Sequence, residues 1–262
     1  MANMTSSVSA SQVAGELASA TFEEIPALVE HYREDPRQQV IKACERALKR
    51  HAKELAERER VNDMYELMHE LGGDGVVVGV DEVGRGSVAG PLTVCAVCLP
   101  MEPRVWGIND SKKLMPARRE LLSVKIAEVA TAIGFCHIAP KDIDEMGMAR
   151  AIRAAVAGAV ADTGLEPDCV LMDGNPLGAV PNERDVVKGD AKIACIAAAS
   201  IMAKVTRDEM MVEYDAEYPE YHLAESKGYA SPEHIEAIRK HGLCPLHRVS
   251  FCGNFLQTER LF

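Results

Sequence analysis

Four acidic residues lie where strands or helices could gather them into one site. Asp81 and Glu82 end the β-branched run that begins at Val76, Asp173 ends a second apolar run, and Asp190 precedes a long helical stretch. Four carboxylates in one pocket would repel each other by roughly 4 kcal/mol per pair at ~4 Å and an effective dielectric constant of ~20. Divalent cations would offset that repulsion. Oxygen-only ligands favour Mg²⁺ or Mn²⁺ over zinc, and two ions would balance four charges.

The adjacency of Asp81 and Glu82 is a geometric difficulty for this site. Neighbouring side chains in a regular strand point to opposite faces, so both cannot reach one metal from ideal β geometry. We therefore predict that the strand kinks or ends between them, with Gly84 providing the freedom.

Asp208 competes with Asp190 as the fourth ligand. If one helix links the two, the eighteen residues between them at ~1.5 Å each separate them by about 27 Å, so they cannot serve one site. Asp208 also has Lys204 four residues before it for an ordinary surface ion pair. We therefore favour Asp190, and any one of the acids taken singly would fit a helix cap or a turn equally well.

A glycine-rich turn follows the first two acids. The sequence Gly84-Arg85-Gly86 places backbone amides and a guanidinium beside the carboxylates, which suits a phosphate better than a sugar. The G-x-G-x-x-G dinucleotide pattern fails by one residue because the next glycine is Gly90, and no G-x-x-x-x-G-K-[ST] pattern exists. Standing alone, these glycines would also fit a plain tight turn.

Short apolar runs and longer helical patterns alternate along the chain and supply the elements that position the acids. Strands are predicted from Val76 through the acids, then at 92–99, 132–138, 169–172 and 185–187. Helices are predicted from Pro116, over 142–161, from near Asp190, and over 232–241. A mixed sheet covered by helices follows from this order, and chemistry in such sheets collects at the strand ends.

The N-terminal region has a different character. Residues 1–20 are small and polar and are expected to be disordered, whereas 25–71 carry a helical pattern. Between Arg33 and Arg60 there are nine Lys/Arg and six Asp/Glu. We interpret this surplus as a solvated helix face that docks on the core, with an auxiliary nucleic-acid-binding appendage as the alternative.

Composition restricts the class of protein. The 262 residues predict one sizeable core with an appendage. The net charge of −11 argues against gripping nucleic acid by charge alone. The eight cysteines lie mostly in apolar runs, typical of reduced thiols in a cytosolic protein, and the C-x-x-C at Cys95 has no second pair to complete a zinc site. We expect neither a signal peptide nor a membrane span.

Seven motifs, taken together and in order, resemble one known family. They run from about Val76 to Phe251 and read GVDEVGRGSVAGPL, NDSKKL, LMDGN, VVKGDA, AAASIMAKVTRD, ESKGY and HRVSF. This set resembles bacterial ribonuclease HII, the type 2 ribonuclease H. The segment YREDPRQQV and the basic helix after it resemble the extension that some members of that family carry.

The resemblance implies an α/β fold in which an RNase H-like mixed β-sheet is flanked by helices. It divides the chain into a helical N-terminal extension (1–72), a catalytic core (73–215) and a C-terminal helical substrate-binding region (216–262). It implies a cytoplasmic endoribonuclease, predicted to be monomeric and without a membrane, with protein partners unknown. Its substrates would be RNA/DNA hybrids and duplex DNA that contains single ribonucleotides. Hydrolysis would use Mg²⁺ or Mn²⁺ and leave 3′-hydroxyl and 5′-phosphate ends.

Residue roles follow from the same resemblance. Asp81, Glu82, Asp173 and Asp190 would hold the metals and form the catalytic set. The Gly84-Arg85-Gly86 turn would read the ribose 2′-hydroxyl, and Tyr229, from K-G-Y, would stack on the junction sugar. The candidate phosphate contacts, each of which would otherwise be an ordinary solvated side chain, are Lys112, Lys113, Lys188 and Lys192.

Two departures from the family pattern and two rival functions complete the predictions. Ser87 and Val88 replace an expected proline and a small or aliphatic residue, which would loosen the turn without moving the ligands. Glu225 replaces a basic or histidine residue expected before K-G-Y, which argues against phosphate contacts there. One rival is another nuclease on the same fold, such as a junction resolvase, which would keep the acids but lack the G-R-G and K-G-Y pair. The other is a non-catalytic nucleic-acid or interaction module.

Overall fold

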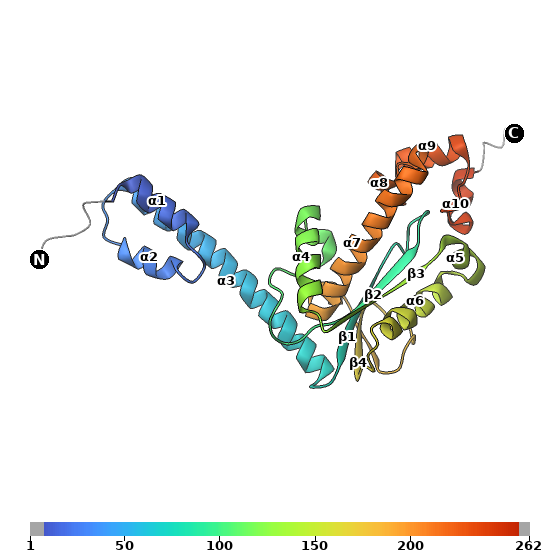
Figure 1. Ribbon diagram of the computed structural model, residues 1–262, viewed down its shortest axis with the longest axis horizontal. Helices are drawn as coiled ribbons and strands as arrows, with labels where there is room; N and C mark the ends of the chain where they lie inside the picture. Colours follow the sequence, from blue (N-terminus) through green and yellow to red (C-terminus); the bar gives the residue numbers. More distant parts are fainter. Residues whose placement is uncertain (1–7, 257–262) are drawn as a thin grey trace, which may run out of the picture. The chain divides into compact units, whose positions relative to one another are not determined.

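A five-stranded mixed sheet forms the centre of the protein, whose computed structural model describes residues 8–256. The strands are β1 (Val77–Val83), β2 (Leu92–Cys98), β3 (Ala132–Ile138), β4 (Cys169–Asp173) and β5 (Glu183–Val186), in the order β3-β2-β1-β4-β5 (Figure 1). β1, β2 and β3 pair antiparallel, whereas β4 runs parallel to both β1 and β5. The predicted mixed sheet is confirmed, because each of the five predicted strands overlaps an observed one, although the last spans 183–186 where 185–187 was expected.

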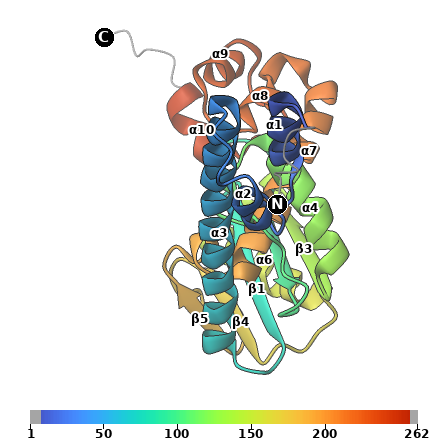
Figure 2. The same ribbon diagram turned by 90° about the vertical axis from the view of Figure 1, so that its left-hand side faces the viewer.

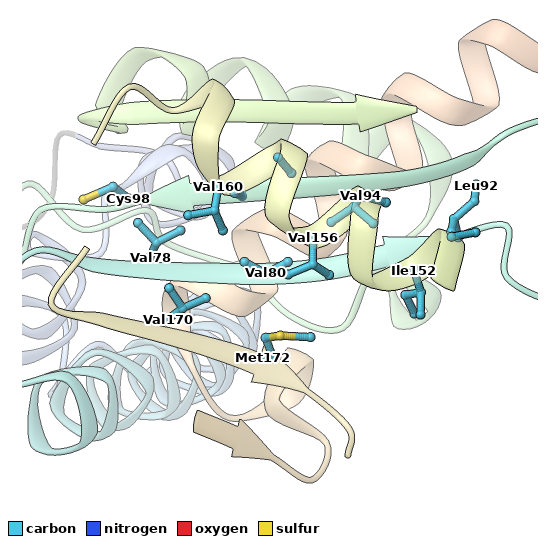
Figure 3. Packing of buried hydrophobic residues seen from close by; sticks show 14 of the residues in the cluster. Val78, Val80, Leu92, Val94, Cys98, Ile152, Val156, Val160, Val170 and Met172 are labelled. Atoms are coloured by element: carbon cyan, nitrogen blue, oxygen red, sulfur yellow. The ribbon is translucent and has the colours of Figure 1, made fainter. Parts of the chain in front are cut away.

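Helices cover both faces of this sheet. Val78 and Val80 of β1 pack with Val94 of β2 against Ile152 and Val156 of α6 (Met148–Asp162), in a core that Figure 3 shows from close by. The opposite face carries α7 (Ala194–Glu217), whose first turns bury a run of small residues that includes Ala197, Ala198 and Ala199.

Close packing of α7 depends on one glycine of β1. A Cβ added at Gly79 would lie 2.3 Å from the carbonyl carbon of Cys195 and 2.5 Å from the amide nitrogen of Ile196. The helix backbone therefore rests directly on the strand. Any larger residue at position 79 would force the two elements apart.

Several helix boundaries differ from the prediction. The helix expected over 142–161 is two helices, α5 (Pro140–Met146) and α6, separated by Gly147 at φ 79°, a conformation that favours glycine. The helix expected from Asp190 begins only at Ala194, and Asp190 itself lies in a 3₁₀ turn, η3 (Gly189–Ala191). The short helix η2 (Ser111–Lys113) follows Asp110.

The other helices of this part follow the predicted starts. α4 (Pro116–Val129) and α9 (Pro232–His241) begin at the expected prolines, and α4 lies beside α7 in Figures 1 and 2. The remaining short elements are η4 (Pro219–Tyr221), α8 (Leu223–Ser226) and α10 (Val249–Leu256). No helix among residues 8–256 is both long enough and apolar enough to cross a membrane.

The N-terminal region forms three helices, α1 (Ala10–Ser19), α2 (Ile25–His31) and α3 (Gln38–Gly72). The expected disorder of residues 1–20 is wrong for 10–19, and residues 1–7 lie outside the described part of the chain. Ser9 caps α1 in a reciprocal box with Gln12, and Val13 and Leu17 are buried against Ile25 and neighbouring α3 residues. Two apolar residues four apart are enough to bury one face of this helix.

The chain divides into two compact units, one ending at Asn62 and the other beginning at Asp63. The division falls inside α3, before the boundary predicted at 72. The last turns of α3 pack within the second unit, where the Tyr65 hydroxyl accepts a hydrogen bond from the Val105 amide at 2.9 Å and Arg184 donates to the Leu71 carbonyl at 2.6 Å. The second unit also includes the region predicted as a separate C-terminal domain.

Candidate active site

The predicted break between Asp81 and Glu82 is wrong. β1 continues through both residues to Val83, because its antiparallel partner β2 holds it there, with Asp81 opposite Cys95 and Glu82 opposite Val94. The parallel pairing with β4 runs only from Val77 to Val80. Both acids therefore belong to the stretch where β1 extends past its parallel neighbour, and Gly84, at φ 85°, ends the strand instead.

Asp81 is a buried carboxyl group, only 8% exposed. Its Oδ1 accepts a hydrogen bond from the Glu82 amide at 2.8 Å. Burial, and then the charge of Glu82, raise its pKa to about 8, although a hydrogen bond with the Ser200 hydroxyl opposes that rise. In the protein alone the group thus holds a proton near neutral pH, and a cation would have to displace that proton.

Asp173 lies among the other three acids. Its Oδ1 accepts a hydrogen bond from the Gly189 amide at 2.7 Å, which ties the end of β4 to the turn that carries Asp190. Burial is the main cause of the raised pKa of Asp81, Glu82 and Asp190, and the charge of Asp173 raises all three further. The structure therefore brings the four predicted acids into one electrostatically coupled group.

A cavity of about 410 Å³ opens beside this group, and three of the four predicted lysines line it. Its wall is formed by Asp110, Lys112, Lys113, Asp173, Gly174, Lys188, Asp190 and Ala191. Lys192 is not among these lining residues, and its ammonium donates to the Val187 carbonyl at 2.9 Å. Of the four lysines, Lys192 therefore has the weakest structural case as a phosphate contact.

Lys112 is the cation most closely tied to the acids. Burial by itself would lower its pKa, but the charges of Asp81, Asp110 and Asp190 outweigh burial and raise it. The ammonium is therefore held firmly in its charged form beside the acidic group. Although Lys112 is exposed, it lines the cavity beside Asp173 and Asp190 and is therefore placed to compensate charge in the site.

Two polar groups of the site were missed from the sequence. Asp110 lines the cavity and caps η2 by accepting from the Lys112 amide at 2.9 Å. Ser200, which hydrogen-bonds Asp81, lies 2.9 Å from the hydroxyl of Ser111. Asp110 stands inside the NDSKK motif, which we interpreted only for its lysines, and Ser200 follows three alanines in a motif to which we gave no role in the site.

Asp208, the rejected fourth ligand, is engaged elsewhere. Its carboxylate pairs with the Lys204 ammonium at 2.7 Å, as predicted, and lies 4.0 Å from Arg119. It lines a separate groove of about 620 Å³ between α4 and α7, which contains none of the four acids.

The donor set fits divalent cations of the magnesium type. All four side chains offer oxygen, and the cations near them include Lys112 and Arg85, whose guanidinium lies 3.5 Å from the Glu82 carboxylate. Among residues 8–256, no three acidic, histidine or cysteine side chains already form a closed metal-binding cluster. Burial is the main cause of the raised pKa values, and repulsion between like charges adds to it and also opposes a closer approach of the four carboxylates.

Two buried arginines hold the glycine-rich turn. Arg207 is fully buried and donates to the carbonyls of Pro91, Ala89 and Lys227 and to the Ser87 hydroxyl, at 2.8–3.0 Å. Each of these acceptors is uncharged, so burial lowers the pKa of this guanidinium. The planar guanidinium of Arg207 thus joins the loop after β1 to the segment before Tyr229.

Arg248 also donates hydrogen bonds to the loop after β1. It is fully buried, donates to the Gly90 carbonyl at 2.9 Å and reaches the Arg85 carbonyl at 3.2 Å. The amides of Val88 and Ala89 in turn donate to the Gly228 carbonyl at 2.8 and 3.0 Å. The G-R-G loop and the K-G-Y turn are therefore one hydrogen-bonded unit.

The two glycines of G-R-G play different structural roles. A Cβ at Gly84 would lie 2.3 Å from Nε of Arg207, and φ is positive there, so the fold itself requires glycine. Gly86 has an ordinary φ and no atom within 4 Å of an added Cβ. Nothing in the described protein explains a glycine at 86.

The expected loosening at Ser87 does not occur. The Ser87 side chain is fully buried, and its hydroxyl donates to the Gly84 carbonyl at 2.9 Å while accepting from Arg207 at 2.8 Å. The serine therefore bridges the turn to the buried arginine. Tyr229 lies beyond this network with 40% of its surface exposed, and its ring centre is 5.7 Å from the Arg207 guanidinium carbon.

Comparison with known proteins gives a consistent picture along the chain. A family model for ribonuclease HII matches residues 78–254, and a model for the ribonuclease HII N-terminal domain matches 9–71. A ribonuclease HII of Moorella thermoacetica is 47% identical over 198 residues, which are 74% of this chain and 96% of that protein. One from Ruminiclostridium cellulolyticum is 44% identical over 204 residues, 77% of this chain and 80% of that protein.

A solved structure agrees with the sequence matches. The ribonuclease H2 of Pyrococcus horikoshii superimposes with a TM-score of 0.59 at 27% identity, covering 70% of this chain and 99% of that one. The mixed sheet, the acids at its strand ends and the glycine-rich turn thus occur in a chain that two adjoining family models cover almost end to end. The chain belongs to the ribonuclease HII family.

Proposed function

We propose that this protein is a metal-dependent endoribonuclease that hydrolyses the RNA strand of RNA/DNA hybrids and incises at single ribonucleotides in duplex DNA. Membership of the ribonuclease HII family supports this activity. One observation supports the assignment of the site above all: the charge of Asp173 raises the pKa of Asp81, Glu82 and Asp190, so the four carboxyl groups lie close enough to interact. These four carboxylates would hold Mg²⁺ or Mn²⁺.

The chemistry divides between the cations and the protein. Bound divalent ions would acidify the attacking water and offset charge on the leaving 3′-oxygen, which leaves 3′-hydroxyl and 5′-phosphate ends. Glu82 and Asp81 would hold the ions from β1, while Asp173 would hold them from the end of the neighbouring strand β4 and Asp190 from η3. Lys112, kept charged by the acids around it, would draw the substrate phosphate toward the carboxylates.

Selection of ribose would come from the unit formed by the G-R-G loop and the K-G-Y turn. The 2′-hydroxyl is the group that distinguishes RNA from DNA at a given nucleotide. The backbone at Gly84–Gly86 would read it, and the exposed ring of Tyr229 would stack on the sugar. Support comes from the two buried arginines, which hold the loop and the turn in a fixed relation before the substrate binds.

A substrate panel with Mg²⁺ and with Mn²⁺ tests this function. We expect cleavage of an RNA/DNA hybrid and of a DNA duplex with one ribonucleotide, and none of all-DNA duplexes. Cutting of branched all-DNA with the single-ribonucleotide duplex left intact would instead identify a junction nuclease. A protein that binds hybrid but cuts nothing with either metal would be a non-catalytic module.

Gly86 provides a sharper test of ribose recognition. Because an added Cβ there meets nothing in the protein, Gly86→Ala should leave the free energy of unfolding within about 0.5 kcal/mol. If the substrate approaches this backbone, kcat/KM on the single-ribonucleotide duplex should still fall at least tenfold. Gly253→Ala is the matched control, since it also has open space and an ordinary φ. Equal activity of the two variants would remove Gly86 from the recognition site.

A further inference from the structure

The K-G-Y turn adopts a backbone conformation that needs external support. Lys227 has φ 51° and Gly228 has φ 76°, so two successive residues lie in the left-handed region. Each of the three carbonyl oxygens of the turn is held from outside it. Arg207 donates to the Lys227 carbonyl, and the amides of Val88 and Ala89 donate to the Gly228 carbonyl. The third carbonyl is that of Tyr229.

The Tyr229 carbonyl is held by a buried histidine. It accepts a hydrogen bond from Nδ1 of His234 at 2.9 Å, besides one from the Ser231 amide at 2.8 Å. His234 is fully buried and lies in α9, outside the turn that it supports. Ser231 belongs to the same cap of α9, so His234 is the side chain that ties the helix body to the tyrosine backbone.

A second buried histidine fixes the tautomer of the first. Nε2 of His234 lies 3.1 Å from Nε2 of His247, and Nδ1 of His247 accepts from the Cys244 amide at 3.0 Å. A carbonyl can only accept and an amide N–H can only donate. His234 therefore carries its proton on Nδ1, and His247 carries its own on Nε2 and donates it to His234.

This arrangement leaves no free nitrogen in the pair. All four ring nitrogens are engaged by a carbonyl, an amide or each other, and burial lowers the pKa of both imidazoles, which keeps them neutral. A metal-binding role would need at least one free lone pair, so the pair does not suit one. Instead, the pair holds the Nδ1–H of His234 in a fixed direction, from which it donates to the Tyr229 carbonyl.

We propose that His234, oriented by His247, is a positioning residue that fixes the backbone of Tyr229 and thereby the angle at which its ring meets the substrate sugar. The inference rests on the sugar-stacking role proposed above for Tyr229. His234 touches no substrate atom. Its effect on cleavage passes through the tyrosine.

Two amide substitutions separate the hydrogen bonds of His234. The amide of Asn reaches the position of Nδ1, whereas that of Gln reaches the position of Nε2. His234→Gln should therefore keep the contact with His247 but lose the bond to Tyr229, and kcat/KM on the single-ribonucleotide duplex should fall about tenfold. His234→Asn should recover most of that loss. His137→Leu, which removes a histidine bonded to Thr93 on the sheet, controls for loss of an imidazole elsewhere.

A double-mutant cycle with Tyr229→Ala decides whether His234 acts through the tyrosine. Once the ring is gone, His234→Gln should change kcat/KM by less than twofold. A tenfold loss in both backgrounds, or equal losses for His234→Gln and His234→Asn, would overturn the inference and leave His234 with a purely structural role. Thermal unfolding of each variant shows whether it is folded at the assay temperature.

Failure of the proposed function would give a different result. If Tyr229→Ala alone leaves kcat/KM unchanged, the stacking role of Tyr229 is wrong and the inference falls with it. If Tyr229→Ala impairs cleavage while His234→Gln does not, only the inference is wrong.

Discussion

Replacing Asp81 by asparagine should abolish cleavage and at the same time make the metal-free protein more stable. The Asp81 carboxyl is buried beside Glu82, and its pKa is raised from an ordinary 3.8 to about 8. In the unfolded chain the same group is ionised at neutral pH. Folding must therefore either bind a proton to this group or bury its charge, and asparagine avoids both costs while keeping a polar group near Ser200.

The size and pH dependence of the effect follow from that shift. An acid with a raised folded pKa contributes most stability below its unfolded pKa, and this contribution is lost as the pH rises through the folded value. The pH interval from the ordinary pKa of 3.8 to pH 7 is about three pH units. At 1.36 kcal/mol per unit, the cost of folding with this group is ~4 kcal/mol at pH 7. The stability difference between Asp81→Asn and wild type should be near zero at pH 4, grow to ~4 kcal/mol at pH 7, and level off above pH 8.

Urea unfolding in EDTA at several pH values measures this difference. Trp106, the single tryptophan, lies in the same compact unit as Asp81, so its fluorescence reports the unfolding of that unit. Adding Mg²⁺ at a hundred times its Kd should stabilise the wild type by ~2.7 kcal/mol, and the variant by less. An asparagine variant that is less stable than wild type at pH 7, or a difference that does not grow with pH, would refute the reasoning.

Four further outcomes are expected. Arg207→Met leaves four buried acceptors unpaired at ~1 kcal/mol each, so urea unfolding should show a loss of about 4 kcal/mol, against under 0.5 kcal/mol for exposed Arg150→Met. Ser87→Ala breaks the bridge from Gly84 to Arg207 and should cost about 1–3 kcal/mol in the same assay. Burial, and then His234, lower the pKa of His247 to about 4, so the stability of the wild type relative to His247→Gln should fall as the pH drops from 6.5 toward 4; a difference between the two proteins that does not change with pH would contradict this. Changing four exposed cations of α3 to glutamine should leave kcat and the salt slope of hybrid binding unchanged if α3 presents a solvated helix face; these cations are Lys42, Arg46, Lys49 and Lys53. A slope reduced by up to about 3.6 would instead identify an auxiliary nucleic-acid-binding appendage.

Local sequence patterns were sufficient to predict the sheet, and they also selected the four acids that the structure brings together. Strands need only short runs of β-branched and apolar residues, which is why 132–138 was predicted to the residue. Likewise, α4 and α9 begin at the prolines that mark them. Helix α1 was missed because a short helix with two buried residues has little local signal.

The course of β1 through the acids could not be predicted, because it depends on a neighbouring strand. The rule that adjacent side chains alternate is local and correct, but whether β1 continues past Asp81 is decided by its pairing with β2 up to Val83. A second neighbouring strand, β4, determines how Asp81 and Glu82 come to lie in one site. β4 stops pairing at Val80, which leaves that end of β1 beside Asp173.

The family and the sheet could be predicted from residue types and short spacings, and the four acids were proposed as a site on the same grounds. How the G-R-G loop is held depends on contacts that form only in the folded protein. Arg207 and Arg248 would be assigned to the surface from their type alone, yet both are fully buried, with acceptors more than a hundred positions away in the chain. His234 and His247 likewise become one donor system only after α9 and the following loop pack together. Hydrogen bonds of this kind depend on distances in space, which no local pattern contains.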